Sequence, residues 1–531
     1  MKSKINATAK FISTIKYHIT GNEIILAVIS GLFFFLSFPK HGFGPMAWFA
    51  LMPLFFAVQK SQSAKRALVL GFITGIVGYV GIVYWITYVV VNYGYLPLYL
   101  GMIIMLLLVC YLSIYIALFS AGVYFLRSKN YFCLVVPALW VSLEYLKSYL
   151  FTGFPWENLG YSQYLNAYFI QFADIFGIFG LSFIIVAVNA VIFTLLVKRT
   201  KSAFLSALTL FLILSSVYIY GYFRIENVRK SMNDAPGMEV SLIQGNIDQS
   251  IKWDELSQSK IINTYLDLSI QNSPQVGGLI VWPETALPFN YQQDSFMREQ
   301  VNNLPKETKS WFLFGAVNFI RSKQGTSFLN SAYLLSPEGA IEGRYDKVHL
   351  VPYGEYVPMR TFFPFIKKLT EGIADFSSGE TYQPLFMEDK KLGVLICYEG
   401  ILPHAARIYK NRSADLLVNI TNDAWFGPTS APYQHFSMAL FRAVETRLYM
   451  IRAANTGISG IVDPTGRIVS QTNIYEADAL RGNVKFTKIE TFYARHGDIF
   501  VVICFIICVI FIILNWRRRF VEWLPKTFRN R

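Results

Sequence analysis

Three polar residues directly follow or end apolar runs, and together they could attack a carbonyl carbon. Glu284 comes after GGLIVWP, Lys347 comes after AIEGRYD, and Cys397 ends the run KLGVLIC. A cysteine attacks a carbonyl as its thiolate, so it needs a neighbouring base or cation. We predict that Cys397 is the nucleophile, that Glu284 takes and returns its proton, and that Lys347 stabilises the thiolate and the oxyanion.

Cys397 differs from the other cysteines in its surroundings. It is the only cysteine between Arg224 and Phe500, whereas the others lie in apolar, membrane-like segments: Cys110, Cys133, Cys504 and Cys508. A lone thiol in a polar domain cannot form a disulfide within that domain, which favours a reactive role. Taken singly, a cysteine at a strand end is more often a small buried residue, so the prediction depends on all three residues together.

The region 224–498 alternates apolar, strand-like runs with polar, helix-like stretches. We expect strands at 238–246, 277–282, 311–318, 330–336, 340–345, 391–397 and 414–420, helices at 252–272 and 433–455, and a hairpin at 459–472 around DPTG. Buried strands interleaved with helices predict a layered α/β domain. Residues just beyond strand ends in such a domain converge on one rim, which would bring the three polar residues together.

Outside that region the composition is typical of a membrane protein. The chain has 531 residues, of which 53% are hydrophobic and 15% charged. Spans of roughly 20 apolar residues are expected in a bilayer, and eight segments approach this length: 23–38, 46–59, 66–90, 96–126, 131–147, 170–197, 203–223 and 499–515. We therefore predict a bundle of about seven spans over 1–223, a soluble domain over 224–498, and a last span with a basic tail over 499–531.

The positive charges predict the orientation of the chain. Lys and Arg gather at the N-terminus, in alternate loops and in the C-terminal tail. By the positive-inside rule both termini are cytoplasmic, and the domain over 224–498 lies outside the cytoplasm. Because much of the net charge of +14 flanks apolar segments, it indicates membrane orientation, and no nucleic-acid partner is expected.

Short strings around the three residues resemble the nitrilase superfamily. They are WPE (282–284), YDKVHLVPYGE (345–355), ICYEG (396–400) and NDAWFG (422–427), in that order. The resemblance implies an α-β-β-α sandwich with a Glu–Lys–Cys triad that forms thioesters at carbonyl or nitrile carbon.

The whole chain resembles the apolipoprotein N-acyltransferase family, in which a nitrilase-like domain is inserted before the last of about eight spans. QGNIDQSIKWDE (244–255) and FPWENLGYSQ (154–163) also fit that family. The resemblance assigns base, oxyanion stabiliser and nucleophile to Glu284, Lys347 and Cys397. It further implies that Trp253, Glu355, Tyr398 and Glu399 are required for activity. From the residues themselves, Glu355 is a candidate to orient Lys347 or to share the proton transfer, and the backbone N–H of Tyr398 is a candidate second oxyanion donor.

The resemblance implies transfer of an acyl chain from a phospholipid, typically phosphatidylethanolamine, through a thioester on Cys397. The acceptor would be the N-terminal amine of diacylglyceryl-cysteine in an apolipoprotein. No metal or other cofactor is implied. The implied location is a bacterial inner membrane, crossed several times, with the catalytic domain on the periplasmic side.

The segment 359–379 contains an apolar group flanked by Arg360, Lys367 and Lys368. The apolar residues are Phe362, Phe363, Phe365 and Ile366. Two interpretations remain open, a mobile lid that enters the headgroup region and a loop packed on its own domain.

Two other functions remain open at this point. A membrane-tethered nitrilase-type amidohydrolase would use the same triad with water as second nucleophile, and a transporter or scaffold would carry an inactive domain. The membrane frame argues against the first, since a small soluble substrate does not need it, and the intact set of polar residues argues against the second.

Overall fold

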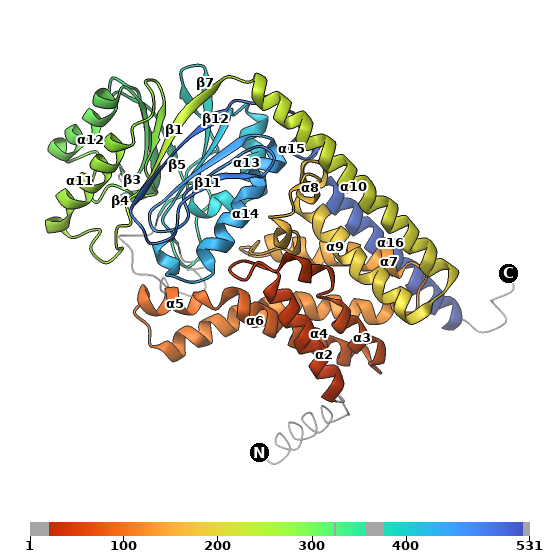
Figure 1. Ribbon diagram of the computed structural model, residues 1–531. Coiled ribbons are helices and arrows are strands. Elements are labelled where there is room, and N and C mark those ends of the chain that lie inside the picture. Colours follow the sequence, from red (N-terminus) through yellow and green to blue (C-terminus); the bar gives the residue numbers. More distant parts are fainter. Residues whose placement is uncertain (1–20, 323–324, 357–375, 524–531) are drawn as a thin grey trace, which may run out of the picture.

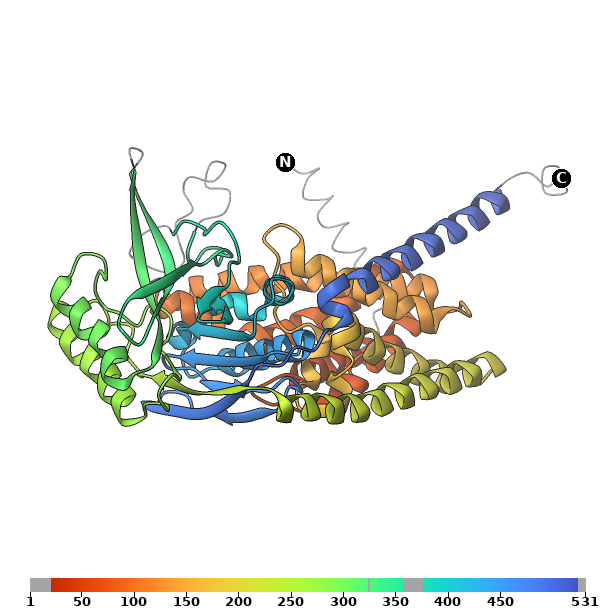
Figure 2. The same ribbon diagram turned by 90° about the horizontal axis from the view of Figure 1, so that it is seen from above.

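The computed structural model describes residues 21–322, 325–356 and 376–523, with the side chains of 321–322 and 515–523 excluded. A helical bundle and an α/β sandwich lie against each other (Figure 1). Seen from above, α10 (Lys201–Asp234) and α16 (Ile499–Trp523) extend away from the sandwich (Figure 2). The predicted lid residues Phe362, Phe363, Phe365 and Ile366 lie outside the described residues.

The bundle contains, besides α10 and α16, helices from the first part of the chain. They are α2 (Gly21–Leu36), α3 (Met52–Lys60), α4 (Ala64–Val83), α5 (Trp85–Asn92), α6 (Leu98–Leu126), α7 (Phe132–Tyr149), α8 (Ala167–Ile170) and α9 (Ala173–Lys198), with 3₁₀ turns η1 (Gly44–Trp48) and η2 (Leu159–Gln163). Helix α10 continues past residue 223 to Asp234, so it carries the chain directly from the bundle to the first strand.

Four helices in the described part of the chain are long and apolar enough to cross a membrane, namely α4, α6, α9 and α10. Shorter apolar stretches occupy 22–36 and 499–514. The predicted count of eight spans is therefore not confirmed. The second predicted span forms η1 and the nine-residue helix α3, which is about 14 Å long, against roughly 30 Å of bilayer hydrocarbon. The third divides at Tyr84 into α4 and α5.

The sandwich consists of two six-stranded sheets. The first has the order β12 (Asp478–Lys485), β1 (Gly237–Gln244), β2 (Leu279–Val281), β3 (Trp311–Ser322), β4 (Gly325–Leu335), β5 (Ile341–Asp346). The second has the order β11 (Ile468–Gln471), β10 (Gly460–Val462), β9 (Tyr449–Ala454), β8 (Leu416–Thr421), β7 (Lys390–Ile396), β6 (Leu385–Met387). Sequence analysis did not predict β6 and β12.

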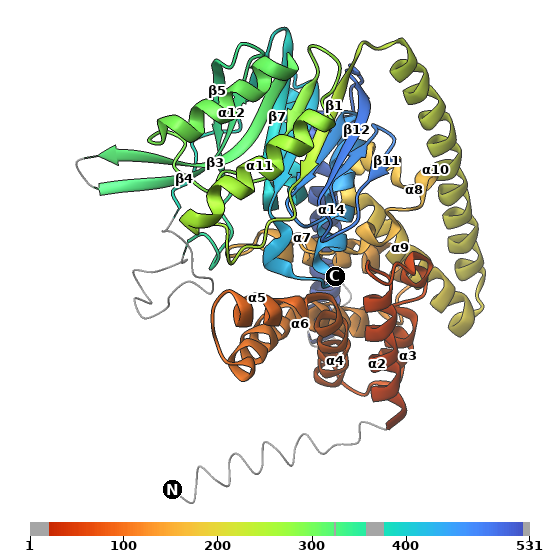
Figure 3. The same cartoon turned by 60° about the vertical axis from the view of Figure 1, so that its left-hand side comes forward.

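Helices cover both outer faces of the paired sheets (Figures 1 and 3). Helices α11 (Glu255–Gln271) and α12 (Ser295–Thr308) lie on the first sheet, and α13 (Pro403–Asn411) and α14 (Ala431–Thr446) lie on the second. The short helix α15 (Phe492–His496) leads into α16. Apolar residues alternate along β1, β2 and β3 between the α11–α12 layer and the core shared with the second sheet. The predicted four-layer α-β-β-α arrangement is confirmed.

The predicted helix over 433–455 is wrong in its second half. Helix α14 ends at Thr446, because Arg447 takes a left-handed backbone conformation with φ of 56°. Residues 449–454 instead form β9, in which all six residues are buried between β8 and β10. An apolar run gives the same signal in a buried helix and a buried strand, so the periodicity did not distinguish them.

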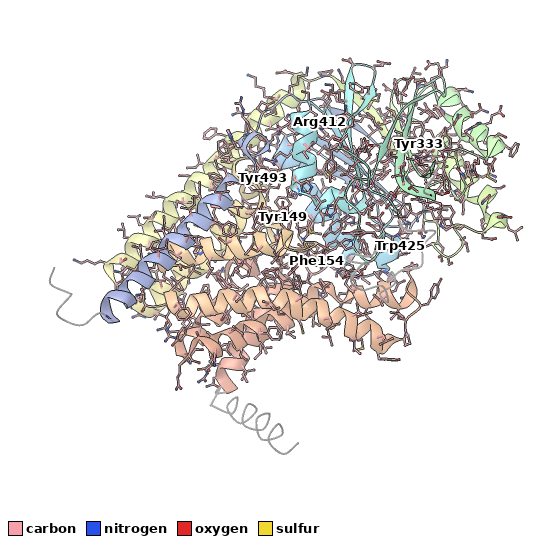
Figure 4. All side chains as sticks on the ribbon, turned by 180° about the vertical axis from the view of Figure 1, so that it is seen from behind. Tyr149, Phe154, Tyr333, Arg412, Trp425 and Tyr493 are labelled. Carbon is pink, nitrogen blue, oxygen red and sulfur yellow. The ribbon has the colours of Figure 1, made fainter. Side chains whose placement is uncertain are left out.

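Buried polar contacts fix the sandwich on the bundle. Arg447 Nη2 donates to Asp174 Oδ2 on α9 at 2.8 Å, and Arg224 Nε on α10 donates to the same oxygen at 2.7 Å. Trp156 Nε1 donates to Gln434 Oε1 on α14 at 2.8 Å. Figure 4 shows Phe154 and Trp425 where the two parts meet. The rim that carries Trp425 therefore faces the bundle.

Candidate active site

The first sheet supplies a lysine held between two carboxylates. Glu284 follows β2 and Lys347 follows β5, and Lys347 Nζ lies 3.8 Å from Glu284 Oε1. Its nearer partner is Glu355, whose Oε2 lies at 2.9 Å. Asn330 Nδ2 donates to Glu284 Oε1 at 2.7 Å and to Glu355 Oε1 at 3.1 Å, which fixes the spacing of the two carboxylates. Glu355 is thus placed to orient Lys347.

The second sheet supplies the cysteine, in a strained turn. Cys397 directly follows β7 and begins the 3₁₀ turn η3 (Cys397–Ile401), with φ of 53°. A left-handed backbone at a residue with a side chain is costly and persists only where the surroundings hold it. Its carbonyl oxygen lies 3.3 Å from Asn419 Nδ2 and 3.3 Å from His435 Nε2. Lys347 Nζ lies close to Glu284, and the neighbours of Lys347 and Cys397, Val348 and Ile396, both donate backbone N–H groups to Glu399, so the three predicted residues lie close together.

Two polar contacts join the sheets at this site. The backbone N–H of Asn422, after β8, donates to Glu284 Oε2 at 2.8 Å. The buried carboxylate of Glu399 accepts the backbone N–H groups of Val348 and His349 at 2.8 and 2.9 Å, and that of Ile396 at 2.8 Å. Glu399 therefore ties the loop after Lys347 to the residue before Cys397. Burial raises the pKa of Glu399 to about 7, because these donors offset only part of the desolvation.

The resting protonation states favour a neutral thiol beside a charged lysine. Burial, and then the negative charge of Glu284, raise the pKa of the Cys397 thiol above its ordinary value, although Lys347 acts in the opposite direction. For Lys347, burial alone would lower the pKa, but the carboxylates of Glu355 and Glu284 outweigh it and raise the pKa. The nucleophile must therefore lose its proton during attack, which requires a base rather than a preformed thiolate.

This protonation state predicts how Cys397 reacts with iodoacetamide. The rate constant for its alkylation is expected to rise continuously between pH 7 and pH 9, since a raised pKa leaves the thiol mostly protonated across that range. Mass spectrometry of the peptide that contains Cys397 separates this signal from the other cysteines. A rate constant that is already constant at pH 7 would show a thiolate in the resting site and contradict the assignment.

Comparison with known proteins matches both parts of the chain. Residues 30–191 match the apolipoprotein N-acyltransferase N-terminal domain, and residues 239–492 match carbon-nitrogen hydrolase. An apolipoprotein N-acyltransferase of Geobacter metallireducens is 42% identical over 508 residues, covering 94% of this chain and 96% of the relative. The chain belongs to the apolipoprotein N-acyltransferase family.

One further relative matches nearly the whole chain, and one solved structure matches about half of it. The apolipoprotein N-acyltransferase of Rickettsia prowazekii is 32% identical over 504 residues, covering 92% of this chain and 96% of the relative. A carbon-nitrogen hydrolase from Helicobacter pylori is a solved structure with 15% identity and a TM-score of 0.37, covering 47% of this chain and 89% of its own. The predicted resemblance to the N-acyltransferase family is confirmed.

Behind Cys397 this family member has a buried ionic network that sequence analysis did not predict. Arg452 Nη2 lies 2.7 Å from Asp423 Oδ2 and 3.0 Å from His435 Nδ1. Burial opposes ionisation of Asp423, but Arg452 and His435 hold its pKa well below the usual range. Burial lowers the pKa of His435, whose Nδ1 lies 3.0 Å from Asp423 Oδ1 and whose Nε2 lies 3.3 Å from the Cys397 carbonyl oxygen. The network thus supports the strained turn.

The remaining predicted residues differ in their placement. The Tyr398 ring stacks on His349 with ring centres 5.8 Å apart, and on Trp156 with centres 6.4 Å apart. Trp156 belongs to the FPWENLGYSQ string, so that string of the N-acyltransferase reaches the active-site rim. Trp253 lies in the turn before α11 with 38% of its side chain exposed. No hydrogen bond or ring contact within the described ranges joins it to Glu284, Lys347 or Cys397.

Sequence analysis missed Asn330 as a site residue and did not single out Asn422 within the string NDAWFG. Both amides are themselves buried, since Asn330 is 4% exposed and Asn422 is 3% exposed. A buried amide needs several hydrogen-bond partners, and a carboxylate is a suitable one. A polar residue within or directly after an apolar run of the sequence was therefore the signal that could have identified Asn330 and Asn422 as site residues.

Proposed function

We propose that this protein transfers an acyl chain from a phospholipid to the N-terminal amine of diacylglyceryl-cysteine in apolipoproteins, with Glu284, Lys347 and Cys397 as catalytic triad. The observation that carries the proposal is the arrangement of the three residues: Lys347 Nζ lies 3.8 Å from Glu284 Oε1, and Glu399 accepts backbone N–H groups from the neighbours of both Lys347 and Cys397. It occurs in a chain that matches named N-acyltransferases over more than nine-tenths of its length. Phosphatidylethanolamine is the proposed donor.

In the first half-reaction Cys397 Sγ attacks the carbonyl carbon of the donor ester while the thiol proton moves to Glu284. The negative charge that develops on the carbonyl oxygen is stabilised by Lys347, with the backbone N–H of Tyr398 as proposed second donor. The ester C–O bond then breaks, and Glu284 gives the proton to the departing lysophospholipid oxygen. The acyl group remains as a thioester on Cys397.

In the second half-reaction the α-amine of diacylglyceryl-cysteine attacks the thioester carbonyl carbon. Glu284 accepts a proton from the amine, and Lys347 again faces the oxyanion. The C–S bond breaks, and the proton passes from Glu284 to the Cys397 sulfur. The products are an N-acylated lipoprotein and the free enzyme, so the cycle is a ping-pong reaction.

The contact between sandwich and bundle suits substrates that are anchored in a membrane. Transfer of an acyl chain into water costs about 0.8 kcal/mol per CH₂ group, so the reaction favours a site beside the bilayer. Tyr93, after α5, donates through its hydroxyl to Ala424 O at 2.8 Å, which places a bundle residue against the rim. We propose that 1–223 and 499–531 are the membrane parts, and that the catalytic domain over 224–498 faces the periplasm of a bacterial inner membrane.

Intact-mass measurement of the protein after incubation with phosphatidylethanolamine tests the proposal. A mass increase of one acyl chain, located on Cys397 and lost when a diacylglyceryl peptide is added, is the expected result. Steady release of free fatty acid without an accumulated thioester would instead identify a hydrolase. Absence of any adduct in folded protein, with every glycerolipid tested, would contradict acyl transfer through Cys397.

A further inference from the structure

A second lysine lies buried in the loop whose Gln249 accepts a hydrogen bond from Asn422, a partner of the predicted base. Lys252 is 1% exposed, and its Nζ makes no hydrogen bond with any residue in the described ranges. Burial lowers its pKa to about 8, and the negative charge of Glu284 acts in the opposite direction. An ammonium group without a partner in a protein interior is unfavourable, and it is stabilised by contact with an anion.

The loop that carries Lys252 is attached to the same polar residues that hold Glu284. Gln249 Oε1 accepts from Asn422 Nδ2 at 2.7 Å, while the backbone N–H of Asn422 donates to Glu284. Ile247 N donates to Asn455 Oδ1 at 2.9 Å, and Asn455 Nδ2 donates to Asn422 Oδ1 at 3.0 Å. Lys252 is thus positioned relative to the active site by the loop's own hydrogen bonds.

The hydrogen bonds of Glu284 show that Lys252 does not serve as its direct partner. Glu284 Oε1 accepts from Asn330, and its Oε2 accepts from Asn422. Lys347 already neutralises part of the charge of Glu284 and Glu355. Lys252 therefore adds a positive charge to the site, and its ammonium group makes no hydrogen bond to Glu284 or Glu355.

We propose that Lys252 binds the phosphodiester of the phospholipid acyl donor. The inference rests on the proposed acyl-transfer function and extends it to donor recognition. In a phospholipid the acylated glycerol carbon and the phosphorylated carbon belong to the same three-carbon unit, so a cation beside the ester site is well placed for the phosphate. A lysine acts on phosphate as a point charge and does not require one headgroup geometry. The diacylglyceryl-cysteine acceptor has no phosphate, so Lys252 acts in the first half-reaction.

The test compares donors with and without the phosphodiester. The initial rate of thioester formation on Cys397 is measured with phosphatidylethanolamine, phosphatidylglycerol and diacylglycerol of identical acyl chains, for the wild type, Lys252→Met and Lys252→Arg. Lys252→Met is expected to lower the ratio of phospholipid to diacylglycerol rates about tenfold or more, for both phospholipids. Lys252→Arg is expected to retain a larger part of this ratio. Lys260→Met, an exposed lysine on α11, serves as matched control.

The outcomes separate this inference from the proposed function. A ratio of phospholipid to diacylglycerol rates that Lys252→Met leaves unchanged would overturn the inference. If the rates with all three donors fall equally, Lys252 acts through Glu284 or the loop. If the wild type forms no thioester with any glycerolipid, the proposed function itself fails. If Lys252→Met does not fold, the wild type alone provides a test, in which the rate of Cys397 alkylation is measured with each of two added compounds. Glycerophosphoethanolamine, which carries the phosphodiester, is expected to slow the alkylation, and glycerol, which lacks it, is not. Equal effects of the two compounds would contradict phosphodiester binding.

Discussion

Replacing Cys397 by serine is expected to abolish the acyl adduct and to lower acyl transfer by about 10⁴-fold or more, as loss of a nucleophile does in well-studied hydrolases. The physical reason is that a serine hydroxyl is a far weaker acid than a thiol, and Glu284 is the only base the proposed mechanism provides. The measurements are intact mass after incubation with phosphatidylethanolamine and the rate of N-acylation of a diacylglyceryl peptide.

Cys110→Ser is the matched control, because Cys110 is also a partly buried free cysteine but lies on α6 in the bundle. It is expected to acylate at the wild-type rate. The Cys397→Ser protein is expected to remain folded, since the exchange conserves size and the carbonyl of residue 397 keeps its hydrogen-bond donors. Wild-type activity in Cys397→Ser would exclude thioester chemistry at this residue.

Replacing Lys347 by methionine is expected to lower thioester formation by about 10²–10³-fold, the usual effect of losing an oxyanion donor. The loss includes a second effect, because methionine leaves the carboxylates of Glu284 and Glu355 facing each other without the cation that lies between them. Like charges at such a distance repel each other, and the geometry of the base changes. The rate is measured from single-turnover formation of the Cys397 adduct.

Removing one member of a buried ion pair also destabilises a protein, by about 3–5 kcal/mol in known cases, so the thermal melting point of Lys347→Met must be measured with its rate. Lys347→Arg keeps the charge, and its partial activity distinguishes lost charge from lost position. Lys309→Met, at an exposed lysine after α12, is the control for a general effect of the exchange. Folded Lys347→Met within tenfold of the wild-type rate would exclude Lys347 as oxyanion stabiliser.

The sequence alone led to the three residues proposed for catalysis, because each of them interrupts an apolar pattern. Glu284, Lys347 and Cys397 come at the ends of strand-like runs, and strand ends of a layered α/β domain share a rim. The same patterns predicted nine of the described strands and helix α11 within a few residues. Local periodicity determines these elements, because it reports which faces of a segment are buried.

Other features depended on contacts between segments far apart in the chain. Residues 449–454 form a strand because β8 and β10 offer hydrogen bonds on both sides. Lys347 lies nearer to Glu355 than to Glu284, and Asn330 and Asn422 hold the base from two different sheets. The second and third predicted spans are divided among η1, α3, α4 and α5, and residues of each of these elements are buried in the core shared by the helices of the bundle.

The sequence by itself therefore determined the family, the layered domain and the three residues proposed for catalysis, since residue type and periodicity are local properties. Only the tertiary structure decided which groups hold those residues and how the loop that carries Lys252 is joined to a partner of Glu284. Hydrogen bonds and charges act over a few ångströms in space, whatever the separation along the chain, and a buried ammonium can be recognised only when its surroundings are known.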